Sequence, residues 1–164
     1  MKQSHAFSGQ TLAQREIIAH WKSIRREGRL PLRAEINPGT LRAHLSSISM
    51  IEVDADGEAR FRLIGSKLHS IFGGDMRGRN LSELASDKAA MWMLGLSSAI
   101  NHGRPVGGIV NRAHDRHAWL RVPLDSGIYG KSLVLCHDML LSQDEVDGHD
   151  PFGLFSTPED SLAA

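Results

Sequence analysis

The pattern of apolar and polar positions changes its period near residue 48. Before that point, between Thr11 and Gly28, apolar residues recur at the spacing of one helix face. These are Ile17, Ile18, Trp21 and Ile24. Thr11 with Gln14 has the pattern of a capping box, and a glycine often ends a helix. The pattern predicts an amphipathic helix whose apolar stripe packs against another surface.

A short second helix is predicted after Asn37-Pro38, carrying Leu41 and Leu45. Strand patterns follow at residues 48–53 and 60–63, separated by an Asp- and Gly-containing turn. Residues 66–72 have helical spacing and stop at two glycines, Asn80 can cap a further short turn, and a longer helix is predicted over residues 87–102. The first 47 residues are therefore mostly helical, and an antiparallel pair of strands comes next.

Three further strands are predicted over residues 106–113, 117–124 and 132–140, as an antiparallel meander. In the middle strand the residues of one parity are all apolar and those of the other are mixed, so one face of the strand is apolar. The apolar set is Ala118, Leu120, Val122 and Leu124, and the mixed set is His117, Trp119 and Arg121. Residues 114–116 are predicted to form the turn, with exposed histidines at 114 and 117.

This element order resembles that of a PAS domain: two strands, short helices, a longer helix and a three-stranded meander. Particular residues are similar to a PAS subfamily common in alphaproteobacteria, over about residues 15–140. In the lead-in they are Trp21, Arg25, Gly28, Leu30-Pro31, Arg33, Ile36 and Pro38; later they are residues 60–66, Phe72-Gly73, Asp75 and residues 78–81. The resemblance implies an α+β fold with a five-stranded antiparallel sheet, helices over one face and an N-terminal helical extension.

We therefore expect a flexible tail over residues 1–10, a helical extension over 11–47, a PAS core over 48–141 and an acidic, flexible tail over 142–164. PAS domains as a class bind small molecules between helices and sheet, or pair with signalling proteins such as histidine kinases. The expected pocket residues are Phe61, Leu63, Phe72, Leu81, Trp92, Leu96, Ile109, Leu120, Val122, Leu135 and His137. His137 alternates with apolar residues, so it either orients a ligand or is a core histidine bonded to a backbone carbonyl.

The sequence identifies no cofactor, and we expect neither flavin nor haem. In light-sensing PAS relatives, a run similar to Gly78-Arg79-Asn80 precedes the cysteine that attacks flavin, but Leu81 follows it here. The same segment lacks the Lys-Ser/Thr of a phosphate loop. His102 and His69 are conceivable haem ligands, and no second histidine pair accompanies residues 114–117 to make a zinc site.

No nucleophile pattern such as GxSxG occurs, so we expect no enzyme and no metal site. The lone Cys136 excludes an internal disulfide. The N-terminus lacks a secretory pattern and no apolar run is long enough to span a bilayer, so we expect a cytoplasmic protein without membrane insertion.

Charge is balanced overall, with 19 basic and 19 acidic groups, which argues against a nucleic-acid partner. The balance is uneven along the chain: residues 132–164 hold seven acidic groups and no Lys or Arg. The remaining residues are correspondingly basic, with a cluster at Arg25, Arg26, Arg29 and Arg33. That cluster could bind the chain's own acidic tail or an acidic partner.

We expect a stand-alone PAS module in signal transduction, because 164 residues leave no room for an attached output domain. It would act by small-ligand binding, by protein–protein interaction, or by both. The alternatives are a ligand-free adaptor in a histidine-kinase pathway, its pocket filled by its own Phe72, Leu81 and Trp92, and a homodimer built on the apolar stripe. The expected interface residues are Ile17, Trp21, Ile24, Arg25 and Arg33.

Overall fold

The computed structural model describes residues 11–142, so the two predicted tails, 1–10 and 142–164, lie outside this range except for residue 142. The N-terminal extension begins with helix α1 (Leu12–Ile24), capped by Thr11 and Gln14 as predicted. Two 3₁₀ helices follow, η1 (Arg33–Glu35) and η2 (Arg42–Ser47). The predicted helix after Pro38 is thus a tighter 3₁₀ segment beginning beyond Leu41.

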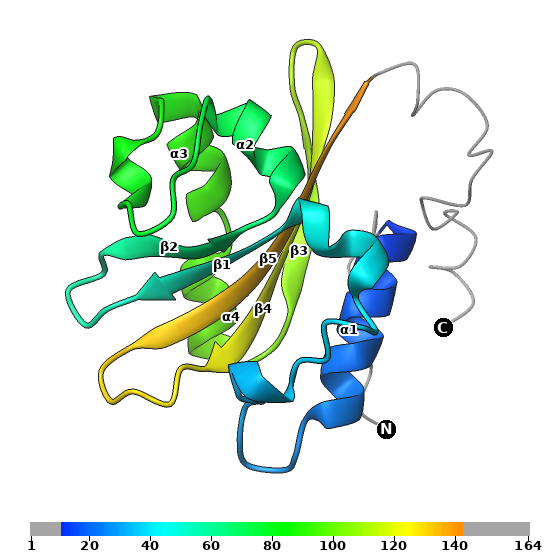
Figure 1. Ribbon diagram of the computed structural model, residues 1–164, viewed down its shortest axis with the longest axis vertical. Coiled ribbons are helices and arrows are strands. Elements are labelled where there is room, and N and C mark those ends of the chain that lie inside the picture. Colours follow the sequence, from blue (N-terminus) through cyan, green and yellow to red (C-terminus); the bar gives the residue numbers. More distant parts are fainter. Residues whose placement is uncertain (1–10, 143–164) are drawn as a thin grey trace.

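Five strands form one antiparallel sheet in the order β2-β1-β5-β4-β3 (Figure 1). Their bounds are β1 (Ile48–Val53), β2 (Ala59–Ile64), β3 (Val106–Asn111), β4 (Asp115–Asp125) and β5 (Ser132–Ser142). β1 lies beside β5, so the first and last strands of the sequence are neighbours at the centre of the sheet. The predicted α+β fold with a five-stranded antiparallel sheet is confirmed.

Short helices connect β2 to β3. They are α2 (Ser66–Phe72), η3 (Leu81–Glu83), α3 (Ser86–Met93) and α4 (Leu96–His102). The single long helix predicted over residues 87–102 is wrong, because Gly95 takes a left-handed conformation with φ +74° and ends the helical run after Met93. A Cβ atom at position 95 would overlap the Trp119 ring, so this break depends on glycine.

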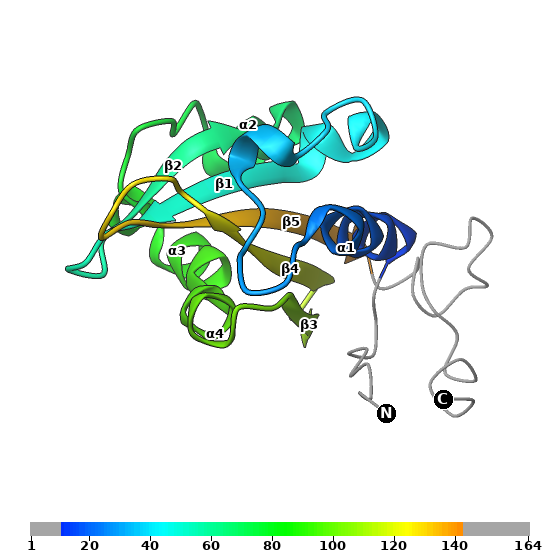
Figure 2. The ribbon, with the colours of Figure 1, turned by 90° about the horizontal axis from the view of Figure 1, so that it is seen from below.

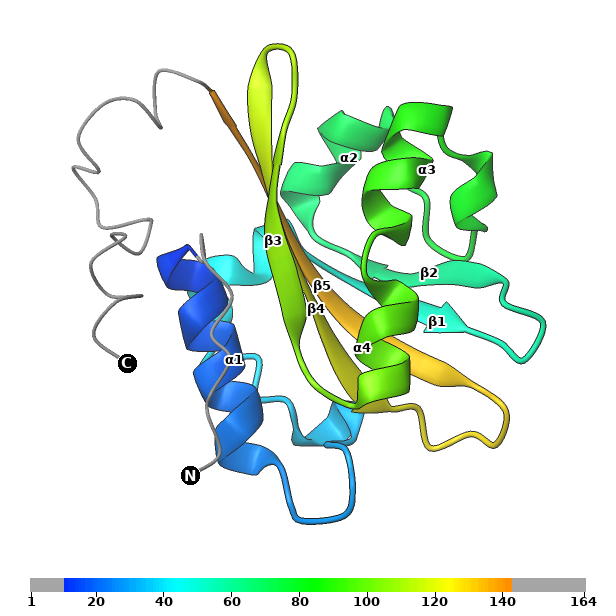
Figure 3. The same ribbon diagram turned by 180° about the vertical axis from the view of Figure 1, so that it is seen from behind.

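Both faces of the sheet are covered. α4 lies in front of the sheet in Figure 3 and behind it in Figure 1. On that side, Phe61, Trp92 and Val134 belong to one buried cluster with the α2–α4 region. On the opposite face, Ile17 and Trp21 of α1 pack with the apolar residues of β4 and β5 in a second cluster. Figure 2 shows α3 and α4 on one side of the strands, away from the N-terminal segment.

The stripe predicted on α1 is thus buried inside the chain. Ile17 and Trp21 are each 2% exposed, and the Trp21 indole donates a hydrogen bond to the Pro123 carbonyl oxygen at 2.8 Å. Since Ile17 and Trp21 pack on the chain's own sheet, the centre of the stripe is not free to build the expected homodimer, while Ile18 and Ile24 are half-buried. Within the described residues, no helix is both long and apolar enough to cross a bilayer.

Candidate functional site

Aromatic side chains fill the space between α2, α3 and the sheet. Trp92 of α3 is completely buried, and its ring meets the edge of Phe72 with centroids 4.7 Å apart. Phe72 in turn contacts Phe61 of β2 at 5.1 Å. Leu81 and Leu96 lie in the same buried cluster. Five of the predicted pocket residues therefore meet in one place, and there they pack on one another.

A buried ionic network lies beside this aromatic group, on the same face of β4 and β5. Asp138 receives hydrogen bonds from Arg121 Nη1 to Oδ1 at 2.9 Å and from Arg121 Nη2 to Oδ2 at 3.0 Å. His117 Nε2 lies 2.6 Å from Asp138 Oδ2. All three side chains are essentially inaccessible to solvent. Because an ionised carboxylate only accepts hydrogen bonds, His117 Nε2 carries the proton.

Charge compensation explains how an acid and a guanidinium remain ionised in the core. Burial alone would raise the pKa of Asp138, but Arg121 and the His117 hydrogen bond outweigh it and hold the pKa below its ordinary value. Burial likewise opposes the charge of Arg121, and Asp138 restores it by raising the pKa of the guanidinium. Each charge therefore depends on the other for its stability.

Arg121 also joins the sheet to the joint between α3 and α4. Its Nη2 donates to the Met91 carbonyl oxygen at 3.0 Å, and its Nε donates to the Leu94 carbonyl oxygen at 2.9 Å. These carbonyls lie at the end of α3, where backbone acceptors have no helical partner. The guanidinium thus satisfies the helix end and holds it above β4, while the Trp119 ring packs over Gly95.

Two buried ring nitrogens next to the network lack a hydrogen-bond partner within the described residues. They are His117 Nδ1 and Trp92 Nε1. The two rings stack with centroids 5.7 Å apart and an interplanar angle of 26°. An unpaired polar atom in the core is costly, so these atoms mark the place where a water molecule or a small polar ligand would be stabilised.

The structure does not bring the eleven predicted pocket residues together. The other six lie on or toward the opposite face of the sheet, which α1 covers: Leu63, Ile109, Leu120, Val122, Leu135 and His137. The apolar side of the meander was expected to face the short helices, but it packs on the apolar stripe of α1. The prediction of one shared pocket is therefore wrong.

His137 is a core residue on the α1 side. Its Nδ1 accepts a hydrogen bond from Gln14 Nε2 at 3.4 Å, and the Gln14 amide oxygen accepts from the Thr11 backbone N–H. Burial lowers the pKa of His137 to about 4, so the ring is neutral near pH 7. The hydrogen-bond partner of His137 is thus the Gln14 side chain of the capping box. One of the expected alternatives had been a backbone carbonyl.

Two other sequence expectations concern histidine and cysteine. His117 is not in an exposed turn, because β4 already begins at Asp115 and places His117 in the core. Cys136 is fully buried, and burial raises the pKa of its thiol to about 12. The described residues contain no group of three or more metal-ligating side chains.

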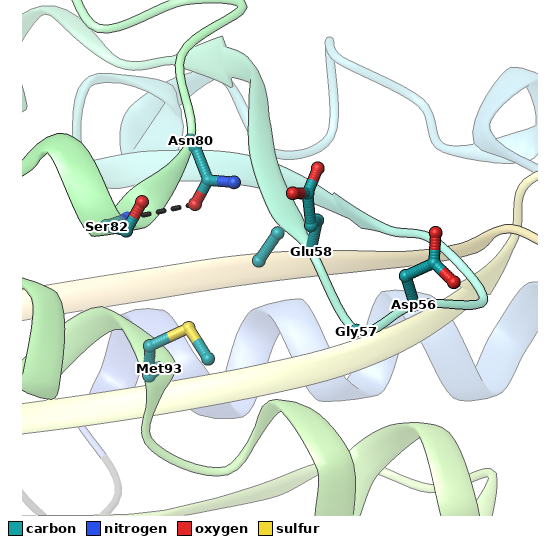
Figure 4. A pocket seen from close by; sticks show the side chains of 7 residues that line it. Asp56, Gly57, Glu58, Asn80, Ser82 and Met93 are labelled. Atoms are coloured by element: carbon teal, nitrogen blue, oxygen red, sulfur yellow. Dashed lines mark hydrogen bonds between the residues drawn. The ribbon is translucent and has the colours of Figure 1, made fainter.

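Surface hollows lie away from the aromatic and ionic groups. One, of about 350 Å³, is bordered by the β1–β2 turn and the start of η3. Figure 4 shows Asp56 and Glu58 on one side of it and Met93 on the other, while Asn80 is turned toward Ser82, whose backbone N–H it caps. The Gly-Arg-Asn motif is therefore structural here: Asn80 begins η3, and Arg79 lies 3.4 Å from Glu83.

A second hollow, of about 570 Å³, lies between η1 and the end of β4. Its lining residues are Leu32, Arg33, Ala34, Ile36, Pro38, Asp125 and Ser126. Of the predicted interface residues, Arg33 is exposed and lines this hollow, and Arg25 is exposed just after α1, over the Trp21 ring. Ile24 is half-buried, and the other two are buried in α1.

The ionic network was missed by sequence reasoning, although a weak signal existed. Arg121 interrupts an apolar strand, and Asp138 interrupts another seventeen residues later. Charged residues inside such strands are rarely buried unless they are paired. The sequence could not show that these two lie on the same face of neighbouring strands.

One family of known proteins matches most of this chain. A solved domain of an HTR-like protein from Haloarcula marismortui is similar at 16% identity and a TM-score of 0.44, over 57% of this chain and 99% of that one. No curated protein is significantly similar in sequence. A family model described as PAS domain matches residues 10–117. This match covers more than half of the chain, and the five-stranded sheet with its helical cover agrees with it. The chain therefore belongs to the PAS domain family, whose members serve as sensory and signalling modules.

Proposed function

We propose that this PAS module acts in signal transduction through contact with another protein, as a ligand-free adaptor. The observation that supports this is the filled interior: Trp92, Phe72 and Phe61 pack together where the family can hold a ligand, and the Arg121–Asp138 pair occupies the space beside them. A signal carried by such a domain has to leave through its surface.

The surface that best suits a partner is the exposed basic region around Arg25 and Arg33, next to the hollow of about 570 Å³. A partner with an acidic, partly apolar segment would match both features. A histidine kinase is the class of partner implied by the family resemblance, and the partner would meet the module in the cytoplasm. The module itself would carry out no catalysis.

Binding to histidine kinases of the native host tests the proposal. Immobilised protein should retain a kinase, and the double variant Arg25→Glu/Arg33→Glu should lose that binding. Arg77→Glu is the matched control, because Arg77 is an exposed arginine on the loop after α2. Equal binding by all three proteins, or by none, would contradict the proposed surface.

A second candidate function is small-ligand sensing, and the unpaired His117 Nδ1 and Trp92 Nε1 favour it. A small polar molecule that satisfies both atoms would bind only the native state and raise its unfolding temperature. A metabolite thermal-shift screen on wild type and on Trp92→Phe separates the two functions. Stabilisation of wild type that the variant loses supports the sensor, whereas no stabilisation together with kinase binding supports the adaptor.

A further inference from the structure

The hollow beside η1 combines apolar walls with Arg33 and with one carboxylate, that of Asp125, which accepts a hydrogen bond from the Gly127 backbone N–H. Leu32, Ile36 and Pro38 supply the apolar lining, and Arg33 stands at its edge. Residues 22–33 carry five basic groups and one acidic group. Arg29 is neutralised by Glu35 at 2.6 Å, but Arg25 and Arg33 form no ion pair with any described residue. The surface therefore fits an acidic segment with apolar side chains.

The chain itself contains such a segment beyond β5. Residues 143–164 carry six acidic groups and no Lys or Arg, and the sequence Asp-Pro-Phe-Gly-Leu-Phe at 150–155 places apolar side chains directly after four of those acids. Opposite charges attract over roughly a Debye length, about 10 Å at 0.1 M salt. Because the two segments belong to one chain, the acidic segment is also present at a high effective concentration.

Chain length agrees with this match. β4 and β5 pair from Asp125 with Ser132 to Asp115 with Ser142, so β5 begins near the hollow and ends far from it. At about 3.3 Å per residue, the ten steps of β5 separate Ser142 from the hollow by about 33 Å. Phe152 is the tenth residue after Ser142, so a nearly extended chain is long enough for Phe152 to span this distance of about 33 Å and reach the hollow.

The direction of α1 provides a route for the returning chain. Gln14, near the start of α1, contacts His137, and Trp21, near its end, contacts Pro123. α1 therefore runs antiparallel to β5, from the side where β5 ends toward the hollow. The basic residues Lys22, Arg25 and Arg26 lie exposed at the far end of this route.

We propose that residues 143–155 fold back along α1, so that the earlier acidic groups lie along the helix, Asp150 lies beside Arg25 and Arg33, and Phe152–Phe155 occupy the hollow at Leu32, Ile36 and Pro38. In this arrangement the segment covers the surface assigned above to a partner. An acidic partner must then displace it, and the segment sets the affinity of that surface. The contact is intramolecular, so its test does not depend on whether a partner exists.

Paramagnetic relaxation enhancement on the full-length chain tests the proposal. A nitroxide is attached to the thiol introduced by Ser156→Cys, next to Phe155. The native Cys136 will not react, because it is buried and its thiol is protonated. At low salt we expect strong broadening of the amide signals of residues 32–36 and 126, relative to the reduced label.

Variants separate the charge from the apolar contribution. Arg25→Glu/Arg33→Glu should abolish the broadening, Phe152→Ser/Phe155→Ser should reduce it strongly, and Arg77→Glu should leave it unchanged. High salt should weaken the broadening, because screening shortens the range of the attraction. Absence of broadening at residues 32–36, or broadening that neither the arginine variant nor salt changes, overturns the proposal.

A mixed sample identifies which chain supplies the segment. Isotope-labelled protein without nitroxide is combined with unlabelled protein that carries it. We expect no broadening in this mixture. If the signals of residues 32–36 broaden as strongly as when isotope label and nitroxide are on the same chain, the segment of a second copy occupies the hollow and the intramolecular proposal is wrong.

Discussion

The neutral, buried His137 should make the stability of this protein depend on pH in a defined window. The native pKa of this residue is about 4, lowered mainly by burial from an ordinary value of 6.5. Between these two values the unfolded chain binds a proton that the native state does not, so the free energy of unfolding falls as the pH falls from 6.5 toward 4. Above pH 6.5 both states are neutral and the effect vanishes.

The magnitude follows from the size of the shift. At 1.36 kcal/mol per pKa unit, a difference between 6.5 and about 4 corresponds to about 3 kcal/mol by the acid end of the window. That is a large fraction of the total stability of a typical domain. Neighbouring charges modify the value: Asp138 opposes the shift, whereas His44, Arg121 and Lys67 add to it.

The His137→Asn variant isolates this contribution, because its side-chain oxygen can still accept the Gln14 hydrogen bond but does not titrate. Urea unfolding followed by circular dichroism between pH 7 and pH 4.5 should give a shallower pH dependence for the variant than for wild type. His114→Asn, in the exposed turn before β4, should follow wild type. Parallel curves for wild type and His137→Asn would refute the neutral buried state, as would an NMR titration of His137 near 6.5.

Three further predictions concern the other side of the sheet. Asp138→Asn should lower the free energy of unfolding by about 3–5 kcal/mol, because it leaves the Arg121 guanidinium buried without a counter-charge. Adding Arg121→Met to this variant should recover part of that loss in urea titrations. A double variant that is as unstable as Asp138→Asn, or less stable, would contradict the pairing. Gly95→Ala should destabilise the protein by about 1–3 kcal/mol more than Gly103→Ala, since both positions are left-handed but only position 95 meets a tryptophan ring; thermal unfolding compares them. Cys136 should react with a thiol reagent only at the rate of global unfolding, so fast labelling of the native protein would show that β5 is accessible.

Much of the fold could be predicted because strands and helices have different periods. Three strand patterns separated by turn signals identified the meander, and Thr11 with Gln14 marked the start of α1. The break between α3 and α4 could not be predicted in the same way. Gly95 is compatible with a continuous helix, at a modest cost, and the Trp119 ring that requires it comes from a strand 24 residues later.

The candidate site was harder to predict, because alternation shows which residues share a face but not what covers that face. Leu120 and Leu135 were correctly grouped as apolar, yet nothing local indicated that α1 rather than the short helices would pack on them. The N-terminal extension was treated as separate from the core. In the structure, this extension covers one of the two faces of the sheet. Because that cover was not predicted, six of the eleven candidate pocket residues were assigned to the wrong face.

The two polar networks explain why β5 has one register. His137 and Asp138 are adjacent and point to opposite faces, one toward Gln14 of α1 and the other toward Arg121 and His117. A slip of one residue would exchange the faces, placing the carboxylate against the apolar stripe of α1 and leaving the guanidinium unpaired. Apolar residues occupy both faces of β5 at positions 133–136, so hydrophobic packing alone discriminates weakly between the two registers. The charges and the histidine supply that discrimination, and they do so at the strand that lies between the N-terminal extension and the short helices.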